Sequence, residues 1–454
     1  MTATGSMPGP DGSPVELAAQ YGALRSAVGA HVLARDVVRV SGPDATSYLQ
    51  GQCSQDVDGL AVGAAADSLL LSPQGKVEAF VRISRLGEQE FVVDTDAGFG
   101  PVVTARLLRF RLRVKVEIEA LPWVCVAVRG PAAAEALSAA GALPVGGAAP
   151  SGGAADQAGA PALVLPVEWP GFTGFDLLGP EPAGGVGAWI ARSAVRCDEA
   201  AWESARIEAG VPQNGREITG GTIAAEVGLV ERSVSFTKGC FTGQELVARL
   251  DARGSKVARR LCGVVLAPTG IPGQGVGTTD ALIGAVVKTA DEVHEVGHLS
   301  SAAWSPRLQA VVGLATLHRR VTPPESVHVA WEDGGGNHVV EAEAHAAPLT
   351  GAARPGPPNP RQPVVGPAGR TPEPPGPAPG PRFRSVLCGG GGDKPCPGRP
   401  WFAEGEFGGG TEWEAGDAPR RTGPVPSDCW SIIGGPSSAG AATSSDPPRG
   451  RGAR

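Results

Sequence analysis

Six short segments typical of β-strands follow one another closely between residues 256 and 348, and they restrict the fold of this region more than any other pattern in the chain. Each is rich in β-branched or apolar residues and ends a few residues before the next one. Their sequences are ARRLCGVVL, ALIGAVVKTA, EVGHLSSAAW, QAVVGLATLH, VHVAW and HVVEAEA. Short strands at this spacing predict a small all-β barrel or sandwich, which we place at residues 255–350.

The region before this domain alternates strand-like and helix-like segments in two similar passes. The first pass predicts a strand at RDVVRVSG, a short helix with an acidic cap at GPDATSYLQGQ, three strands across residues 67–96 and a helix at residues 101–110. The second pass begins with the strand WVCVAVRG. This mixture predicts an α+β body with antiparallel sheet, divided into modules at residues 31–135 and 136–254.

Three segments have compositions that do not favour a packed core. Residues 1–30 read as a disordered lead-in and lack the basic and apolar regions of a secretory signal. Residues 141–161, rich in Gly, Ala and Pro, are expected to form a surface loop. Residues 351–454 are dominated by Gly and Pro without a collagen repeat, so we expect a disordered tail; the composition would also fit translation of a shifted reading frame.

The charge and the cysteines of this chain argue against nucleic-acid-binding, zinc-binding and disulfide-rich classes of protein. The formal net charge of -7 indicates no basic face for nucleic acid, and no apolar run reaches the roughly 18 residues of a membrane helix. The 8 cysteines are scattered, without a CxxC pair or a Cys/His cluster at zinc spacing, which favours a reducing compartment. We therefore expect a cytoplasmic monomer with no metal site, no direct nucleic-acid partner and no membrane association.

The stretch KGCFTGQELVAR, residues 238–249, places a thiol next to a predicted helix. SVSFT before it alternates like a strand, and Thr242 and Glu245 have the spacing of a capping box. Cys240 is therefore predicted in a strand-to-helix turn, on a helix that ends at Gly254. The helix N-terminus and the nearby ammonium of Lys238 would both favour the thiolate.

The two glycines of this stretch, Gly239 and Gly243, permit a tight turn and the close approach of a ligand to backbone amides. Two interpretations of the cysteine stay open from these residues. Cys240 is either a reactive thiol or a small buried side chain among turn-forming glycines. Cys125 and Cys262, which lie in apolar strands, are predicted to be core residues.

The same stretch resembles the signature K-G-C-[FY]-x-G-Q-E-x-x-x-R of the YgfZ folate-binding family, whose members are relatives of the glycine-cleavage T-protein (aminomethyltransferase). WESARIEAGVP, TIAAEVGL, SYLQGQCSQDV, LLLSPQGKV and RFRLRVKVEI resemble further family segments in the expected order, across residues 31–350. The resemblance implies three modules around a central cleft, namely two α/β halves and a β-barrel. It also implies a tetrahydrofolate ligand and a role in assembling or maintaining iron–sulfur clusters in client enzymes, including tRNA-modifying ones.

By this resemblance, Cys240 and Lys238 carry the chemistry, and a further set of residues holds the folate. That set is Trp202, Glu208, Gly239, Phe241, Gly243, Gln244, Glu245 and Arg249. Trp202 offers an aromatic face for a pterin, and Glu208 and Gln244 offer hydrogen bonds to its edge. The alternatives stay open: Trp202 as a core residue, Glu208 and Gln244 as ordinary helix-end side chains, and Arg249 as a solvated cation or the partner of a carboxylate.

Three functions are compatible with the resemblance. The first is the iron–sulfur accessory protein, and the second is a folate-dependent aminomethyltransferase. T-proteins carry a G-G-x-x-D-D element where this chain has Gln74 to Ala79 with the single acid Glu78, and their T-G-E-x-G stretch appears here as Thr173 to Asp176. Both departures favour the YgfZ branch. The third function is a non-catalytic folate-binding scaffold, in which Cys240 is dispensable.

Overall fold

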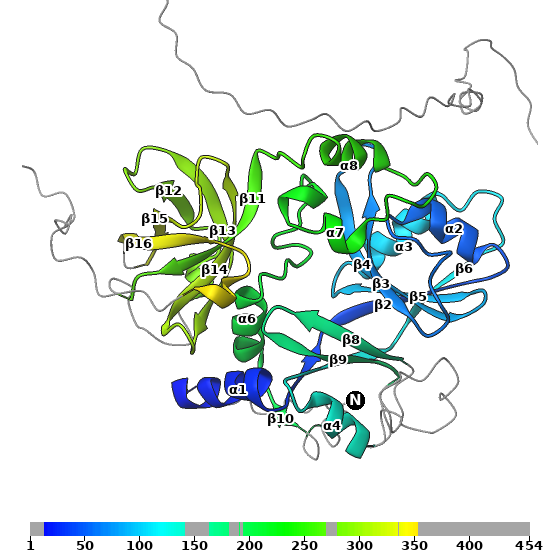
Figure 1. The fold of residues 1–454 in the computed structure, drawn as a ribbon, viewed down its shortest axis with the longest axis horizontal. Helices are drawn as coiled ribbons and strands as arrows, with labels where there is room; N and C mark the ends of the chain where they lie inside the picture. Colours follow the sequence, from blue (N-terminus) through cyan, green and yellow to red (C-terminus); the bar gives the residue numbers. More distant parts are fainter. Residues whose placement is uncertain are drawn as a thin grey trace, which may run out of the picture. The chain divides into compact units, whose positions relative to one another are not determined.

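The computed structural model describes residues 13–140, 163–180, 190, 194–268, 279–334 and 336–352. All of them lie in one compact unit that comprises residues 1–366. Two five-stranded sheets and a closed six-stranded barrel form its framework (Figure 1). The mixed α and β content and the C-terminal barrel that the sequence predicts are therefore confirmed.

The first sheet has the strand order β3-β4-β5-β2-β6 and is antiparallel throughout. Its strands are β2 (Arg35–Ser41), β3 (Ala65–Leu71), β4 (Val77–Gly87), β5 (Glu90–Asp96) and β6 (Glu117–Leu121). Helices α2 (Ala45–Gln52) and α3 (Gly100–Arg109) pack on one face, against the apolar residues of one parity in each strand. The side chains at the alternate positions of each strand therefore point away from these helices, toward the second sheet.

The second sheet has the order β10-β1-β7-β9-β8. Its strands are β1 (Gly29–Leu33), β7 (Val124–Arg129), β8 (Leu163–Trp169), β9 (Phe172–Gly179) and β10 (Val195–Arg196). Helix α4 (Ala133–Ala139) covers its outer face, and α1 (Pro14–Ser26) and α6 (Glu199–Glu208) pack beside it. Val37 and Val92 of the first sheet meet Cys125, Leu165 and Leu178 of the second, so the two sheets pack face to face.

The N-terminal segment differs from its prediction as a disordered lead-in, because residues 14–26 form helix α1. The Ser13 hydroxyl accepts a hydrogen bond from the Glu16 amide as an N-cap. Leu17, Tyr21 and Leu24 follow at helical spacing and are buried against α6. Strand β1 then joins the second sheet, so the second module is discontinuous in sequence and the first module begins only at β2. Residues 1–12 lie outside the described residues.

All six strands expected after residue 255 are present, and they close into a barrel in the order β11-β14-β13-β12-β15-β16. They are β11 (Arg259–Leu266), β12 (Val286–Thr289), β13 (Glu295–Ser305), β14 (Ala310–His318), β15 (Glu325–Asp333) and β16 (Gly336–Ala346). Alternate residues fill the interior, including Val264, Leu317 and Val329. Closure pairs each of the six described strands with a neighbour on both sides, so none of them is an edge strand.

Helix α6 connects the second sheet to the barrel. The Ser204 hydroxyl donates to the Trp304 carbonyl at 2.6 Å, and the Arg206 guanidinium donates to the Ser301 hydroxyl at the same distance. Glu208, at the end of the helix, accepts hydrogen bonds from Ser305 and Arg307. Each partner lies on β13 or just after it, so the barrel is held in a defined orientation by polar contacts along one helix.

The remaining described elements are short. They are η1 (Ala224–Glu226), α7 (Val230–Ser233), α8 (Gln244–Asp251), η2 (Asp280–Leu282) and η3 (Leu349–Gly351). In Figure 1, α8 lies beside the ends of β3 and β4 and leads into β11. The loop predicted at residues 141–161 and nearly all of the predicted tail lie outside the described residues. Within the described part, no helix is both long and apolar enough to cross a membrane.

Candidate functional site

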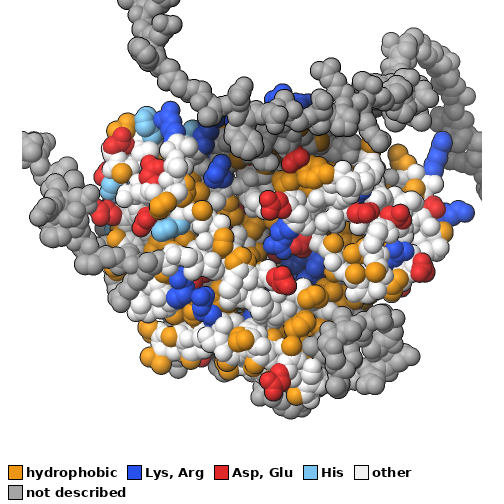
Figure 2. Space-filling view, viewed as in Figure 1, with side chains coloured by type: hydrophobic (Ala, Val, Ile, Leu, Met, Phe, Trp, Pro, Cys, Tyr) orange, Lys and Arg blue, Asp and Glu red, His pale blue; other side chains and the backbone are white. Residues whose placement is uncertain are grey.

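A cavity of about 370 Å³ lies between the inner faces of the two sheets and is bordered by α6 and the segment after it. Its aromatic lining is formed by Phe80, Trp169 and Trp202. Its charged lining is formed by Arg35, Arg82, Arg206, Arg232, Asp67, Asp96, Glu168 and Asp176. Figure 2 shows Lys or Arg and Asp or Glu side chains side by side near the middle of the visible face, with hydrophobic side chains around them. The cavity therefore combines aromatic surface with both signs of charge.

Strand alternation explains why the charged residues point into this space. On β5, Phe91 and Val93 face α2 and α3, whereas Asp94 and Asp96 have the opposite parity. On β4, Val81 faces the helices, and its neighbours Phe80 and Arg82 have the opposite parity. The cavity is thus lined by residues that would face water in an isolated sheet and that face a second sheet here.

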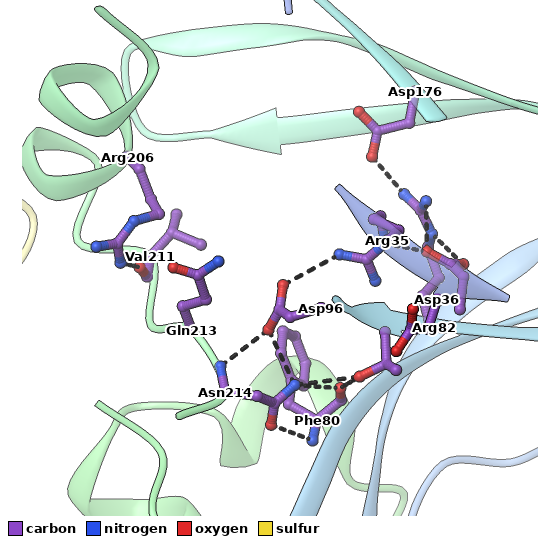
Figure 3. A network of polar contacts seen from close by, with 12 residues as sticks. Arg35, Asp36, Phe80, Arg82, Asp96, Asp176, Arg206, Val211, Gln213 and Asn214 are labelled. Atoms are coloured by element: carbon purple, nitrogen blue, oxygen red, sulfur yellow. Dashed lines mark hydrogen bonds and ion pairs between the residues drawn. The ribbon is translucent and has the colours of Figure 1, made fainter. Parts of the chain in front are cut away.

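Arg82 joins the two sheets by binding a carboxylate on each. It contacts Asp94 of its own sheet at 3.0 Å. It also contacts Asp176 on β9 at 2.7 Å, as Figure 3 shows. Arg129 on β7 holds the other oxygen of Asp176 at 2.8 Å, and Arg35 contacts Asp94. All five side chains are at most 15% exposed, so each charge depends on its partners rather than on water.

The carboxyl of Asp176 stays ionised within this network. Burial opposes ionisation, but the guanidinium groups of Arg129 and Arg82 outweigh it and lower the pKa of Asp176 to about 2. Both carboxylate oxygens already carry an arginine partner. Asp176 therefore acts as a fixed negative charge between two arginines and is poorly placed to exchange a proton with a ligand near neutral pH.

Asp96 is held differently. Its Oδ2 atom accepts hydrogen bonds from the backbone amide and the side-chain amide of Asn214, each at 2.9 Å. Its Oδ1 atom has one long contact, 3.4 Å, with Arg35. Figure 3 shows Asp96 between Arg35 and Asn214 in this network. The Oδ2 atom is therefore largely occupied by the hydrogen bonds from Asn214, whereas the Oδ1 atom can still accept hydrogen bonds.

Trp202 belongs to the aromatic side of the cavity. It is 3% exposed and stacks on His31 with ring centroids 5.0 Å apart, while Trp169 is tilted against it at 4.9 Å. The Arg129 guanidinium lies about 5 Å from both indole rings. Trp202 thus lines the cavity and is also packed in a core cluster. Its interpretation as a core residue is confirmed, and its role toward a folate stays a prediction.

The Cys240 loop lies apart from the cavity, since none of residues 238–249 lines it. The ammonium of Lys238 donates to the carbonyls of Gln50, Cys53 and Gln55 at 2.6, 2.7 and 2.8 Å. The Gln50 carbonyl lies in the last turn of helix α2 and the other two lie just after it, where a cation is favoured by the helix dipole. Lys238 therefore fastens the loop to the SYLQGQCSQDV segment and directs its charge at these carbonyls.

Cys240 is exposed, whereas the other cysteines of the described part, Cys53, Cys125, Cys197 and Cys262, are buried. Burial raises the pKa of the Cys53, Cys125 and Cys197 thiols to about 12 and that of Cys262 to about 11. The loop around Cys240 is anchored on both sides. Ser235 donates to the Ser54 carbonyl and Thr242 to the Gly51 carbonyl. The structure therefore excludes the interpretation of Cys240 as a buried side chain.

The local geometry around Cys240 corrects two predictions. SVSFT is not a strand: α7 ends at Ser233, and an irregular loop follows. The capping box of Thr242 and Glu245 is also wrong, because the N-cap is Gly243, with a φ of 82° and no side-chain cap. The tight packing of this turn decides the outcome. A Cβ on Gly243 would lie 2.5 Å from the Ser72 carbonyl oxygen, so only glycine fits.

The end of helix α8 agrees with its prediction. The Ser255 amide donates to the Leu250 carbonyl and the Gly254 amide to the Asp251 carbonyl, the pair of bonds expected of a Schellman motif. Gly254 has a φ of +72°, as its C′ position requires. Cys240 therefore sits in a loop between two helices, not between a strand and a helix.

The other residues predicted to bind the ligand are placed outside the cavity. Phe241 packs against a separate apolar cluster, and Gln244 accepts a hydrogen bond from the Phe241 amide. Glu245 and Arg249 form an exposed ion pair one turn apart on α8. Gly239 has open space around it, and Gly243 approaches Ser72 rather than a ligand. In the described part, only Trp202 of the predicted set lines the cavity.

Glu208 is also turned away from the cavity. Its carboxylate is fully buried between the Ser305 hydroxyl and the Arg307 guanidinium, both at 2.6 Å. Glu78, at the position of the T-protein acidic pair, forms an ion pair with Arg106 at 2.7 Å. The structure instead brings Arg35, Asp96 and Gln213 to the cavity, none of which the sequence analysis selected. The parity of Asp94 and Asp96 in EFVVDTD was the available signal, because charged residues there interrupt the buried face of a strand.

Comparison with known proteins supports the T-protein-like part of the resemblance. Residues 16–238 match the family model described as the GCVT N-terminal domain. An uncharacterized protein of Haemophilus influenzae is 28% identical over 221 residues, which cover 48% of this chain and 67% of that protein. An aminomethyltransferase of Corynebacterium jeikeium is 27% identical over 325 residues, covering 65% of this chain and 80% of that one.

The fold is similar to that of a solved T-protein. The crystal structure of the glycine cleavage system aminomethyltransferase T from Bartonella henselae matches with a TM-score of 0.60 at 22% identity, covering 74% of this chain and 90% of that chain. This likeness shows a GcvT-like fold, with its C-terminal barrel.

The exposure of Cys240 predicts the order of thiol alkylation in the native protein. With iodoacetamide at neutral pH, we expect Cys240 to react before Cys53, Cys125, Cys197 and Cys262, which are buried with raised pKa values. Peptide mapping over time measures the order, and unfolding in urea should abolish it. Labelling of Cys262 as fast as that of Cys240 would contradict the placement of the loop.

The Asp176 network predicts a specific acid dependence of stability. The folded pKa of about 2 lies below the ordinary value of 3.8, so the stabilisation is present above pH 3.8 and is lost as the pH falls through 2. Asp176→Asn should lower the free energy of unfolding by about 3–5 kcal/mol at pH 7, because it leaves buried arginines unpaired. The difference from wild type should shrink between pH 4 and 2.

Denaturant titrations across this pH range measure the effect, with the exposed Glu135→Gln as the matched control. The control should follow wild type at every pH. A constant difference between Asp176→Asn and wild type from pH 7 to 2 would show that Asp176 is not held ionised by its arginines.

Proposed function

We propose that this chain is a tetrahydrofolate-binding accessory protein that assists assembly or repair of iron–sulfur clusters in client enzymes, including tRNA-modifying ones. The single observation that carries the proposal is the exposed Cys240, held on an anchored loop outside the cavity. A thiol that acted on a ligand inside the cavity would have to face it. A thiol presented to solvent on a fastened loop is suited to meeting another protein.

The cavity fits a reduced folate. About 370 Å³ is within the range of small-molecule sites, and aromatic rings with a few fixed polar groups are the usual lining. Trp202 and Trp169 offer ring surface for a pterin, and Asp96 and Gln213 offer hydrogen bonds to its edge. Tetrahydrofolate, when bound, supplies a carrier of one-carbon groups. The residues of this chain would bind and orient it and exclude water from the ring.

A folate-dependent aminomethyltransferase is the second candidate, because several curated relatives carry that name and the fold is GcvT-like. The acidic groups of this chain count against it. Glu78 is paired with Arg106, and Ala79 replaces the second acid of the T-protein pair. Asp176 is locked between two arginines. A non-catalytic scaffold is the third candidate, and only the role of Cys240 separates it from the first.

Binding of the ligand is the first test. We expect tetrahydrofolate to bind the full chain with a Kd in the micromolar range, roughly −8 kcal/mol, and to quench tryptophan fluorescence because Trp202 and Trp169 line the cavity. Trp202→Phe should retain the fold but lose most of the fluorescence change. A flat calorimetric titration together with unchanged fluorescence would refute tetrahydrofolate binding.

The role of the thiol is the second test. In a cell that lacks this protein, wild type should restore the activity of iron–sulfur enzymes and Cys240→Ser should not. Ala248→Ser, on the exposed face of the neighbouring helix α8, is the matched control and should restore activity fully. Restoration by Cys240→Ser at equal protein abundance would favour the scaffold over a thiol-dependent role.

A further inference from the structure

We infer that Asp96, rather than Glu208, is the carboxylate that recognises the ligand in the central cavity, and that it does so together with the Gln213 amide. The inference rests on the proposed function and specifies the chemistry of that site. The Oδ1 atom of Asp96 would accept a hydrogen bond from an amino group at one end of a heterocycle's edge, and the Gln213 side-chain N–H would donate to a carbonyl oxygen at the other end. This pattern fits a 2-amino-4-oxo ring, whose edge presents two donors followed by one acceptor.

Comparison of the carboxylates that line the cavity leads to Asp96. Asp176 has an arginine on each oxygen. Asp67 receives two hydrogen bonds from Arg232, both on Oδ2. Glu168 makes no ion pair or hydrogen bond within the described residues but is exposed, so a ligand would have to order its flexible side chain at an entropic cost. Asp67 and Asp96 each keep capacity on one oxygen, but they are held differently. The partner of Asp67 is Arg232, a long side chain that is 41% exposed, whereas Asp96 is held by the buried Asn214, so its orientation is the better fixed of the two.

The protein positions Asp96 through two elements. Strand β5 fixes its backbone, because residues 90–96 pair with β2 along their whole length. The two hydrogen bonds from Asn214 then fix the Oδ2 atom at 2.9 Å. Asn214 is itself held, since its side chain bonds the Phe80 amide and carbonyl on β4. A carboxylate with its orientation set in advance loses little entropy on binding.

The surroundings of this carboxylate leave its Oδ1 atom able to accept a hydrogen bond. The Arg35 guanidinium lies 3.4 Å from Oδ1, a long contact that does not saturate the oxygen. The Asp96 side chain is 15% exposed, so a hydrogen bond formed there is little screened by water. A donor-rich ring edge would therefore gain more from this group than from an exposed carboxylate at the mouth of the cavity.

Gln213 supplies the second half of the pattern. Its backbone amide is bonded to Glu217, but its side-chain oxygen is buried without a hydrogen-bond partner in the described part of the structure. The side-chain Nε2 atom makes no hydrogen bond within the described residues either, so its N–H groups are free to donate. Gln213 and Asp96 both line the cavity and are both labelled in Figure 3. A ligand that presents a donor to Asp96 and a carbonyl oxygen to Gln213 Nε2 would bond both side chains and would be selected by the order of its donors and acceptors.

The ring edge can be tested with two small probes of the same shape. Pterin (2-amino-4-oxopteridine) carries the proposed edge, and lumazine (2,4-dioxopteridine) has a carbonyl in place of the amino group. We expect the wild-type full chain to bind pterin about tenfold or more tightly than lumazine, because lumazine places an acceptor against the Asp96 carboxylate. Asp96→Asn should weaken pterin binding and bring the ratio of the two Kd values close to one.

Two control variants change other carboxylates of the same cavity. Glu168→Gln and Asp67→Asn should keep the wild-type ratio, because neither residue is proposed to contact the ring edge. Lumazine binding by Asp96→Asn at wild-type strength or better reports that the cavity is intact. Gln213→Leu should weaken both probes alike, since both retain the 4-oxo group, and should leave the ratio nearly unchanged.

The outcomes separate this inference from the proposed function. Tetrahydrofolate binding with equal Kd values for pterin and lumazine, or a ratio that persists in Asp96→Asn, overturns the role of Asp96 and leaves the function standing. A ratio lost in Glu168→Gln overturns it in favour of Glu168. Failure of tetrahydrofolate and both probes to bind overturns the proposed function, and the inference with it.

Discussion

Arg82 is the residue on which the arrangement of the cavity depends. Its guanidinium binds Asp94 on the first sheet and Asp176 on the second, and it is itself only 12% exposed. Charges taken out of water are tolerated only where partners meet them with good geometry. The separation of the two sheets at this point is therefore set by the length of one arginine between two carboxylates. The width of the cavity beside it depends on the same separation of the two sheets.

The thiol and the cavity are two separate sites on one chain. Lys238 links the loop of Cys240 to the end of α2 through three carbonyls, and it thereby joins two segments that lie more than 180 residues apart in sequence. None of residues 238–249 lines the cavity, so under the proposed function a folate in the cavity and a partner protein at Cys240 would not compete for the same residues.

The GcvT-like fold is retained here while the acidic groups of T-proteins are changed. Glu78 forms an ion pair with Arg106, and Asp176 forms the ion pair with Arg82 that connects the two sheets. Both carboxylates are therefore already paired with arginines. The aromatic residues that line the cavity, Phe80, Trp169 and Trp202, take no part in these ion pairs.

The sequence by itself determined the elements of this protein wherever the pattern is local. The six barrel strands, the strand RDVVRVSG, the helix that begins near residue 100 and the C-terminal glycine of α8 all follow from hydrophobic periodicity and backbone preference. Helix α1 carried the same kind of signal in Leu17, Tyr21 and Leu24 and was missed because the flanking residues are rich in Gly and Pro.

Only the tertiary structure decided which residues meet. Thr242 had the spacing of a cap, yet the close approach of Gly243 to Ser72 from another module selected a different helix start. Glu208 belongs to the segment WESARIEAGVP that resembles the family, but its carboxylate accepts hydrogen bonds from Ser305 and Arg307 of the barrel region. Asp96 and Gln213 line the same cavity because Asn214, next to Gln213 in the chain, bonds Asp96 from 118 residues away in sequence. Long-range pairing of polar groups depends on the positions of whole elements, and no local pattern encodes it.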